Sequence, residues 1–321
     1  MHRRPRVVIG ALVLAALALI VPAQAADLEG PPVALHAAAK PAAAGASAGA
    51  SAKGSSSAPA APAAAGRPDG VGNAAGWYLQ LGDSLAAGYQ PDRGEDLTGG
   101  YADDVLGALR EDAGKTKLEN ISCPGETVVT MMDGGRCDYP KGSQLDQALH
   151  FLHAHGDKTR AIAVTIGAND VVSCVLTGSL DEECLVQGLA EVNERLPQVL
   201  GALREAAPDA EIVVTNYYNP ILAFWLQGSD GQALAEQSMG LQDQLNSIIA
   251  GAAASADAEV ADVAAAFESD NLTPVDDVPG AVPTNVARLC ELTWMCEAFD
   301  IHANTEGYDL IGEAVAVELT A

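Results

Sequence analysis

Residues 81–88 read Leu-Gly-Asp-Ser-Leu-Ala-Ala-Gly and follow directly on the short β-rich run Trp77 to Leu81. That run predicts a strand, and Gly82 allows the chain to turn tightly after it. A serine on such a turn can present its hydroxyl to a crevice, so Ser84 is a candidate nucleophile. We therefore expect the first strand to end at a reactive side chain.

The same local pattern recurs along the chain. Four more β-rich runs lie at residues 117–122, 161–166, 211–216 and 259–263. Helical patterns lie between and after them, at residues 101–111, 143–155, 182–206, 232–253 and 305–319. This alternation predicts an α/β domain with a five-stranded parallel sheet covered by helices on both faces. Ligands bind beyond the carboxyl ends of such strands, so the chemistry should lie at that edge.

Three other segments are expected at that edge. Residues 123–127 read Cys-Pro-Gly-Glu-Thr and follow the second strand, and residues 166–170 read Ile-Gly-Ala-Asn-Asp and end the third. Residues 299–302 read Phe-Asp-Ile-His and precede the last helix. A histidine exchanges protons near neutral pH and can serve as the base that a serine hydroxyl needs.

These four blocks, in this chain order, resemble the SGNH hydrolase superfamily, the GDSL-type lipases and esterases, in a secreted bacterial form. The resemblance extends over residues 77–321 and implies a flavodoxin-like, three-layer α/β/α sandwich. It implies Ser84 as nucleophile and His302 as its base. The oxyanion donors would be the backbone N–H groups of Ser84 and Gly125 and the side-chain amide of Asn169.

The sequence departs from the family at the partner that orients the histidine. The family usually has an aspartate three residues before it, where this chain has Phe299, and the acid here is Asp300. An extended segment places positions i and i+2 on one side, so Asp300 is our choice, with a main-chain carbonyl as the alternative. Asp83 and Asp170, beside the reactive residues, are expected to form turns by bonding local backbone.

The expected reaction is hydrolysis of carboxylic esters, either acyl esters or lipids, through an acyl-enzyme intermediate and without cofactor or metal. The apolar run at residues 221–226 would either line an acyl pocket or pack in the core. A carbohydrate acetylesterase acting on polysaccharide is the alternative within the same chemistry. A catalytically silent, exported binding module is the alternative from another class.

The N-terminal part predicts export. Basic residues, the apolar stretch Val7 to Val21 and Ala23-Gln24-Ala25 form a signal peptide over residues 1–25, too short to span a bilayer. Residues 26–76 are dominated by Ala, Gly, Ser and Pro and predict a disordered linker before the domain at 77–321. Within that linker, residues 45–49 match a nucleophile-elbow pattern but lack its strand and helix.

Charge and histidine spacing exclude several kinds of partner. The formal net charge is −26, so nucleic acids and anionic membranes are disfavoured and the substrate should be neutral or held by shape. We expect a secreted, extracellular monomer that acts on a small-molecule or lipid ester and has no transmembrane segment. His150, His153 and His155 fit no standard metal-ligand spacing, so no metal site is expected there.

The cysteine count fits an oxidising compartment. Six cysteines without a Cys-x-x-Cys pair indicate disulfides rather than a metal site. Six allow many pairings, and we favour the sequential ones because each brackets a short segment: Cys123 with Cys137, Cys174 with Cys184, and Cys290 with Cys296. Each pair would lie beside one of the reactive segments.

Overall fold

The computed structural model describes residues 75–176, 180–276, 278 and 280–320. The predicted signal peptide and almost all of the predicted linker lie outside these residues, so both stay predictions. The first strand, β1, begins at Gly76, one position before the expected start of the domain.

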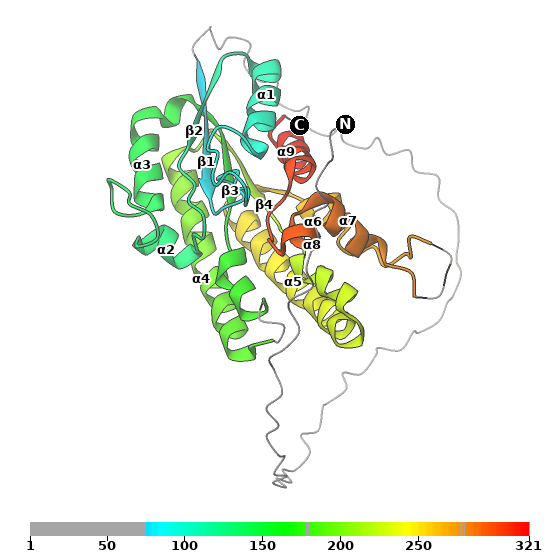
Figure 1. Cartoon of the computed structure of the whole chain (residues 1–321). Helices are drawn as coiled ribbons and strands as arrows, with labels where there is room; N and C mark the ends of the chain where they lie inside the picture. The colour runs from blue at the N-terminus through cyan, green and yellow to red at the C-terminus, as the bar shows by residue number, and fades with distance from the viewer. Residues whose placement is uncertain (1–74, 177–179, 277, 279, 321) are drawn as a thin grey trace, which may run out of the picture. The chain divides into compact units, whose positions relative to one another are not determined.

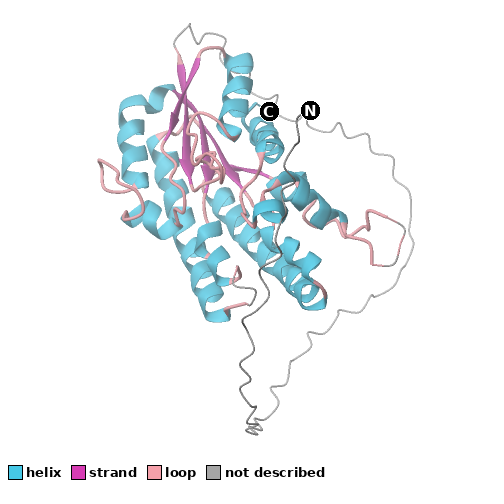
Figure 2. Cartoon of the chain, viewed as in Figure 1, coloured by secondary structure: helices cyan, strands magenta, loops and turns pink. Residues whose placement is uncertain are grey.

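A five-stranded parallel sheet forms the centre of the domain, in the order β2-β1-β3-β4-β5 (Figure 2). Its strands are β1 (Gly76–Gly82), β2 (Thr116–Asn120), β3 (Thr159–Thr165), β4 (Glu211–Thr215) and β5 (Glu259–Ala261). The central strands are buried on both faces, which explains why they are nearly continuous apolar runs. All five predicted strands are confirmed, and the order is that of flavodoxin-like folds.

The five predicted helices are present with nearly the expected bounds. They are α1 (Tyr101–Ala113), α3 (Gln144–His155), α4 (Glu182–Ala206), α5 (Ser229–Ser255) and α9 (Thr305–Thr320). The sequence patterns missed the shorter α2 (Val128–Asp133), α6 (Val263–Ala266), α7 (Thr284–Leu292) and α8 (Met295–Ala298). They also missed four 3₁₀ helices: η1 (Gly156–Lys158), η2 (Ala168–Asp170), η3 (Val172–Cys174) and η4 (Pro220–Gln227). Elements this short carry too few residues for a clear helical period.

The helices form two layers around the sheet. α1 and α9 contact each other on one side, and α3, α4 and α5 pack in sequence on the other (Figure 1). The three-layer α/β/α sandwich is therefore confirmed. No helix of the described residues is long and apolar enough to cross a membrane.

The strand order locates the site. From β1 the chain moves to β2 at one flank and then crosses to β3 at the other. The order reverses between β1 and β3, and a crevice opens at their carboxyl ends. Ser84 follows β1 and Asn169 follows β3, so the topology places both at this crevice.

Candidate active site

Three side chains form a hydrogen-bonded row at the crevice. Nε2 of His302 lies 2.7 Å from Oγ of Ser84, and Nδ1 of His302 lies 2.6 Å from Oδ1 of Asp300. The same Asp300 oxygen accepts the backbone N–H of His302 at 3.0 Å. Asp300, two residues before the histidine, thus occupies the position expected of the orienting acid.

The segment that carries the histidine is held by backbone contacts on both sides. The backbone N–H of Trp294 donates to the carbonyl of His302 at 3.0 Å, and the hydroxyl of Tyr218 donates to the carbonyl of Ile301 at 2.6 Å. These bonds use the main chain and leave the imidazole free to face Ser84.

The turn that carries Ser84 rests on a buried carboxyl. Asp83 accepts the backbone N–H of Leu85 at 2.9 Å, the local turn contact that was expected. Its other oxygen accepts the hydroxyl of Tyr217, which the sequence did not indicate. Burial raises the pKa of Asp83 to about 6, although both hydrogen bonds act in the opposite direction.

A glutamine from α3 ties this turn to the next loop. The amide of Gln144 accepts the N–H of Gly82 at 2.7 Å and donates to the carbonyl of Gly82 at 3.0 Å. It also lies 3.1 Å from Oε2 of Glu126, which is fully buried beside Gly125. Sequence reasoning missed Gln144, because nothing local to it refers to a strand 62 positions away.

The proposed oxyanion residues lie on two loops that contact each other. The Asn169 side-chain amide donates to the backbone carbonyl of Glu126 at 3.0 Å. This bond joins the loop after β3 to the loop after β2. Gly125 has φ 78°, and a Cβ there would lie 2.3 Å from the Arg136 guanidinium. The positive φ therefore favours glycine, and a residue with a Cβ would also have to displace the exposed Arg136 side chain.

Asp170 was expected to form a turn by bonding local backbone, but it also bonds the backbone of a distant element. Oδ2 of Asp170 accepts the backbone N–H of Val128, the first residue of α2, at 3.1 Å. Desolvation by burial raises the pKa of Asp170 to about 7. The reason is that a backbone N–H in the first turn of a helix has no acceptor within the helix. Asp170 supplies the acceptor for Val128 from η2.

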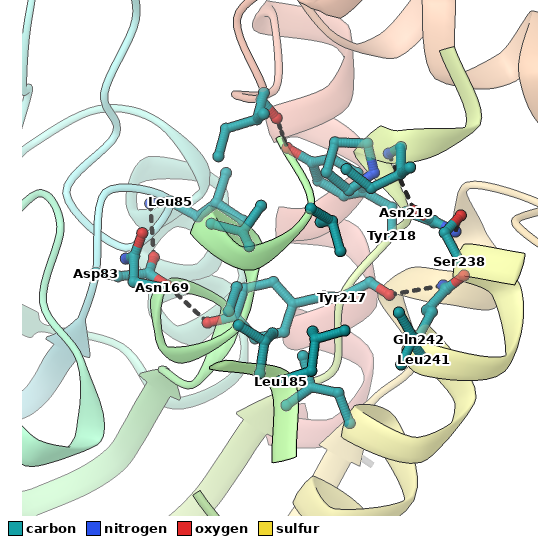
Figure 3. A pocket seen from close by; sticks show the side chains of 18 of the residues that line it. Asp83, Leu85, Asn169, Leu185, Tyr217, Tyr218, Asn219, Ser238, Leu241 and Gln242 are labelled. Atoms are coloured by element: carbon teal, nitrogen blue, oxygen red, sulfur yellow. Dashed lines mark hydrogen bonds between the residues drawn. The ribbon is translucent and has the colours of Figure 1, made fainter. Parts of the chain in front are cut away.

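An apolar cavity opens beside the row, with Ser84, Asn169 and His302 in its lining. Much of its apolar wall lies in and beside η3 and on α4 and α5, and these residues are Val171, Val172, Val175, Leu185, Leu189, Leu241 and Leu245. Figure 3 shows Asp83 and Asn169 at one side, Leu241 and Gln242 at the other, and Tyr217 between them. Gly125 is not among the described residues that line this cavity.

The run at residues 221–226 divides between the two expected roles. Ile221 lines the cavity together with Pro220, whereas Leu222, Ala223 and Phe224 are buried in the core and do not. The larger apolar wall was missed, because valines and leucines on separate elements look like ordinary core positions in the sequence.

The six cysteines form the three sequential pairs Cys123–Cys137, Cys174–Cys184 and Cys290–Cys296. The first brackets Gly125. The second joins the loop after Asn169 to the start of α4, where Val175 and Leu185 line the cavity. The third joins α7 to α8, shortly before His302.

The histidines of α3 take no part in the site. His155 packs against the rings of Trp77 and Phe151. In the described part of the chain, no group of three or more His, Cys, Asp or Glu side chains could hold a metal ion.

Comparison with known proteins identifies a related family. The family described as "GDSL-like Lipase/Acylhydrolase family" matches residues 81–310. No curated protein matches the chain.

Solved structures with a similar chain path share little sequence with this protein. A lipase from a goat rumen metagenome is 16% identical (75% of this chain, 96% of that one, TM-score 0.46). A putative GDSL-like lipase from Parabacteroides merdae is 15% identical (76% and 95%, TM-score 0.48). An extracellular lipase from Streptomyces rimosus is 20% identical (75% and 99%, TM-score 0.46).

Proposed function

The chain belongs to the GDSL-like lipase/acylhydrolase family of carboxylic ester hydrolases, and we propose that it cleaves acyl esters through an acyl-enzyme formed on Ser84. The observation that carries the proposal is the row Ser84–His302–Asp300, with 2.7 Å and 2.6 Å between successive polar atoms. A nucleophile, a base and a group that orients the base are the parts that this chemistry needs.

In the proposed reaction, Nε2 of His302 takes the hydroxyl proton of Ser84 while Oγ attacks the ester carbonyl. Asp300 holds Nδ1–H and stabilises the imidazolium that results. The alkoxide-like oxygen is stabilised by the N–H groups of Ser84 and Gly125 and by the amide of Asn169. Each such donor contributes about 3 kcal/mol when tested by removal. The imidazolium then protonates the departing alcohol, and water releases the acid by the same steps.

The cavity supports acyl chains longer than acetyl as substrates. It begins at Ser84 and continues between valines of the loop after β3 and leucines of α4 and α5. Each buried methylene contributes about 0.8 kcal/mol of transfer free energy, so a chain that fills this space gains over acetate. An acetyl group is too short to contact this apolar wall, so the wall would not contribute to binding in a carbohydrate acetylesterase.

The proposal is tested with p-nitrophenyl esters of increasing acyl length. The wild-type protein should hydrolyse them with kcat/KM rising from acetate towards medium chains. Ser84→Ala should abolish turnover with little change in melting temperature, and a fluorophosphonate probe should label wild type only. Full activity in Ser84→Ala would overturn the assignment, and activity confined to acetyl groups would favour the polysaccharide deacetylase instead. An unlabelled, folded wild type would favour the silent binding module.

Export supplies the setting for this reaction. The N-terminal pattern and the three disulfides support a protein that is cleaved after Ala25 and released into an oxidising compartment, where we expect it to act as a monomer. N-terminal sequencing of protein from the culture medium should begin at Ala26, and light scattering should give one chain per particle. Retention of residues 1–25 in exported protein would contradict the leader.

A further inference from the structure

The aromatic ring of Tyr89 packs against the imidazole of His302. The two ring centroids are 4.5 Å apart and the planes are inclined at 49°. Tyr89 lies five positions after Ser84 in the sequence. It is not among the described residues that line the apolar cavity. It therefore contacts the base without contacting the space in which we place the acyl chain.

The backbone of Tyr89 is fixed on both sides. Its N–H donates to the carbonyl of Ser84 at 3.0 Å, and its carbonyl accepts the hydroxyl of Tyr308 at 2.8 Å. Gly88 has φ 61°, which lets the chain turn back so that Tyr89 reaches Ser84. The ring is thus held by the turn that carries the nucleophile.

A second contact joins the same two segments. Oε1 of Gln90 accepts the indole N–H of Trp294 at 3.2 Å, and the backbone N–H of Trp294 binds the carbonyl of His302. Ser84 and His302 are 218 positions apart in the sequence, so their 2.7 Å contact depends on such ties. Among these contacts between the two segments, the packing of Tyr89 involves the imidazole ring itself.

We infer that Tyr89 is a positioning residue for His302, whose ring keeps Nε2 on the Ser84 hydroxyl and stabilises the imidazolium formed during attack. This inference rests on the proposed function. An aromatic face attracts a cation within about 6 Å of the ring centroid, and the attraction grows when solvent is excluded. The ring therefore stabilises the imidazolium that forms when Ser84 gives up its proton.

The test uses two variants of Tyr89 and one matched control. Tyr89→Leu keeps apolar bulk and removes the ring, whereas Tyr89→Phe keeps the ring. The control is Phe151→Leu, because Phe151 packs on His155 with nearly the same geometry, 4.8 Å and 52°, on a histidine outside the site. All three are compared with wild type on p-nitrophenyl butyrate, with melting temperatures measured in parallel.

Tyr89→Leu should lower kcat by about 10-fold, which corresponds to about 1.4 kcal/mol, with KM unchanged because the cavity is untouched. Tyr89→Phe should keep most of kcat, and Phe151→Leu should leave kcat per folded molecule unchanged. A wild-type kcat in Tyr89→Leu would overturn the inference. So would a loss in Tyr89→Phe as large as in Tyr89→Leu, since the hydroxyl and not the ring would then be responsible.

A proton NMR measurement tests the contact without relying on turnover. The imidazole signals of His302, assigned by their absence in His302→Gln, should show a ring-current shift in wild type and Tyr89→Phe that disappears in Tyr89→Leu. An unchanged shift in Tyr89→Leu would show that the rings do not touch, and the inference would fail. If wild type hydrolysed no ester, the proposed function would fail, and this measurement alone would decide whether Tyr89 positions His302.

Discussion

The hydroxyl of Tyr217 donates a 2.7 Å hydrogen bond to Oδ2 of Asp83, the buried residue immediately before Ser84. The two residues are 134 positions apart, so the bond links the loop after β4 to the turn that carries Ser84. Burial raises the pKa of Asp83 to about 6 and that of Tyr217 well above its ordinary value. At neutral pH the turn therefore holds a buried carboxylate that needs both of its donors.

This carboxyl predicts a particular pH dependence of stability. Between its ordinary pKa of 3.8 and its folded value of about 6, Asp83 keeps in the folded state a proton that the unfolded chain has released. The free energy of unfolding should therefore fall as the pH rises through this window, by up to about 3 kcal/mol from Asp83. Asp83→Asn has no carboxyl proton to lose at this position. Its free energy of unfolding, measured by urea denaturation at each pH, should therefore vary less with pH than that of wild type.

Two details sharpen this measurement. Asp170, whose pKa is raised to about 7, contributes a slope of the same sign, so Asp83→Asn should reduce the total slope without abolishing it. The exposed Asp209 provides the control, and Asp209→Asn should run parallel to wild type. Parallel profiles for Asp83→Asn and wild type would contradict the prediction.

Asp300→Asn tests the acid that contacts His302. The substitution keeps the size of the side chain and removes the charge that stabilises the imidazolium, so kcat should fall about 100-fold or more with little change in KM. Glu297→Gln, an exposed acid on the neighbouring α8, should leave kcat unchanged. A nearly wild-type kcat in Asp300→Asn would indicate that a main-chain carbonyl orients the base.

Gly125→Ala tests the loop that carries the second proposed oxyanion donor. Residue 125 has φ 78°, which is strained for any residue with a Cβ, and the added Cβ would also displace the Arg136 side chain from its 2.9 Å bond to the carbonyl of Pro124. The backbone of residue 125 should shift to relieve this positive φ, and loss of one donor lowers kcat by about 100-fold. Steady-state kinetics on butyrate esters measures this.

Gly135→Ala is the matched control for this prediction. Gly135 also has a positive φ, 98°, but nothing lies within 4 Å of its Cβ position. Both variants bear the conformational cost of about 1–2 kcal/mol for a left-handed residue. Only Gly125→Ala should lose turnover, and equal losses would indicate that general destabilisation is the cause.

The disulfide Cys174–Cys184 should affect chain-length preference. It joins the loop of Val172 and Val175 to the α4 turn of Leu185, all in the cavity wall. Replacing both cysteines by alanine should lower kcat/KM for octanoate more than for acetate, because the wall loosens while the Ser84 turn is unaffected. Mild reductant should likewise reduce turnover while far-ultraviolet circular dichroism stays nearly constant, since loops open more easily than the sheet.

The pair Cys290 and Cys296 serves as the comparison. This bond lies before His302, and neither of its cysteines lines the apolar cavity, so its removal should lower kcat for all chain lengths alike. An equal effect of both double variants across the ester series would remove the link between Cys174–Cys184 and the acyl wall. Joint loss of activity and secondary structure on reduction would show that the disulfides stabilise the whole fold.

The sequence by itself determined the sheet, the main helices and the candidate segments for the site. Period-two and period-3.6 patterns are local, and long elements such as α4 repeat them often enough to be recognised. The positions of Ser84, Asn169 and His302 followed from the same logic, because each lies next to an element whose end could be predicted. Short spacing likewise favoured the disulfide pairs that are present.

Only the tertiary structure decided how these segments meet. The bonds of Gln144 to Gly82 and of Tyr217 to Asp83, and the packing of Tyr89 on His302, join residues that no local pattern relates. The apolar cavity arises in the same way, since its wall combines apolar residues in and beside η3 with others from α4 and α5. An apolar residue follows the same pattern whether it faces the core or a cavity, and only packing determines which one it faces.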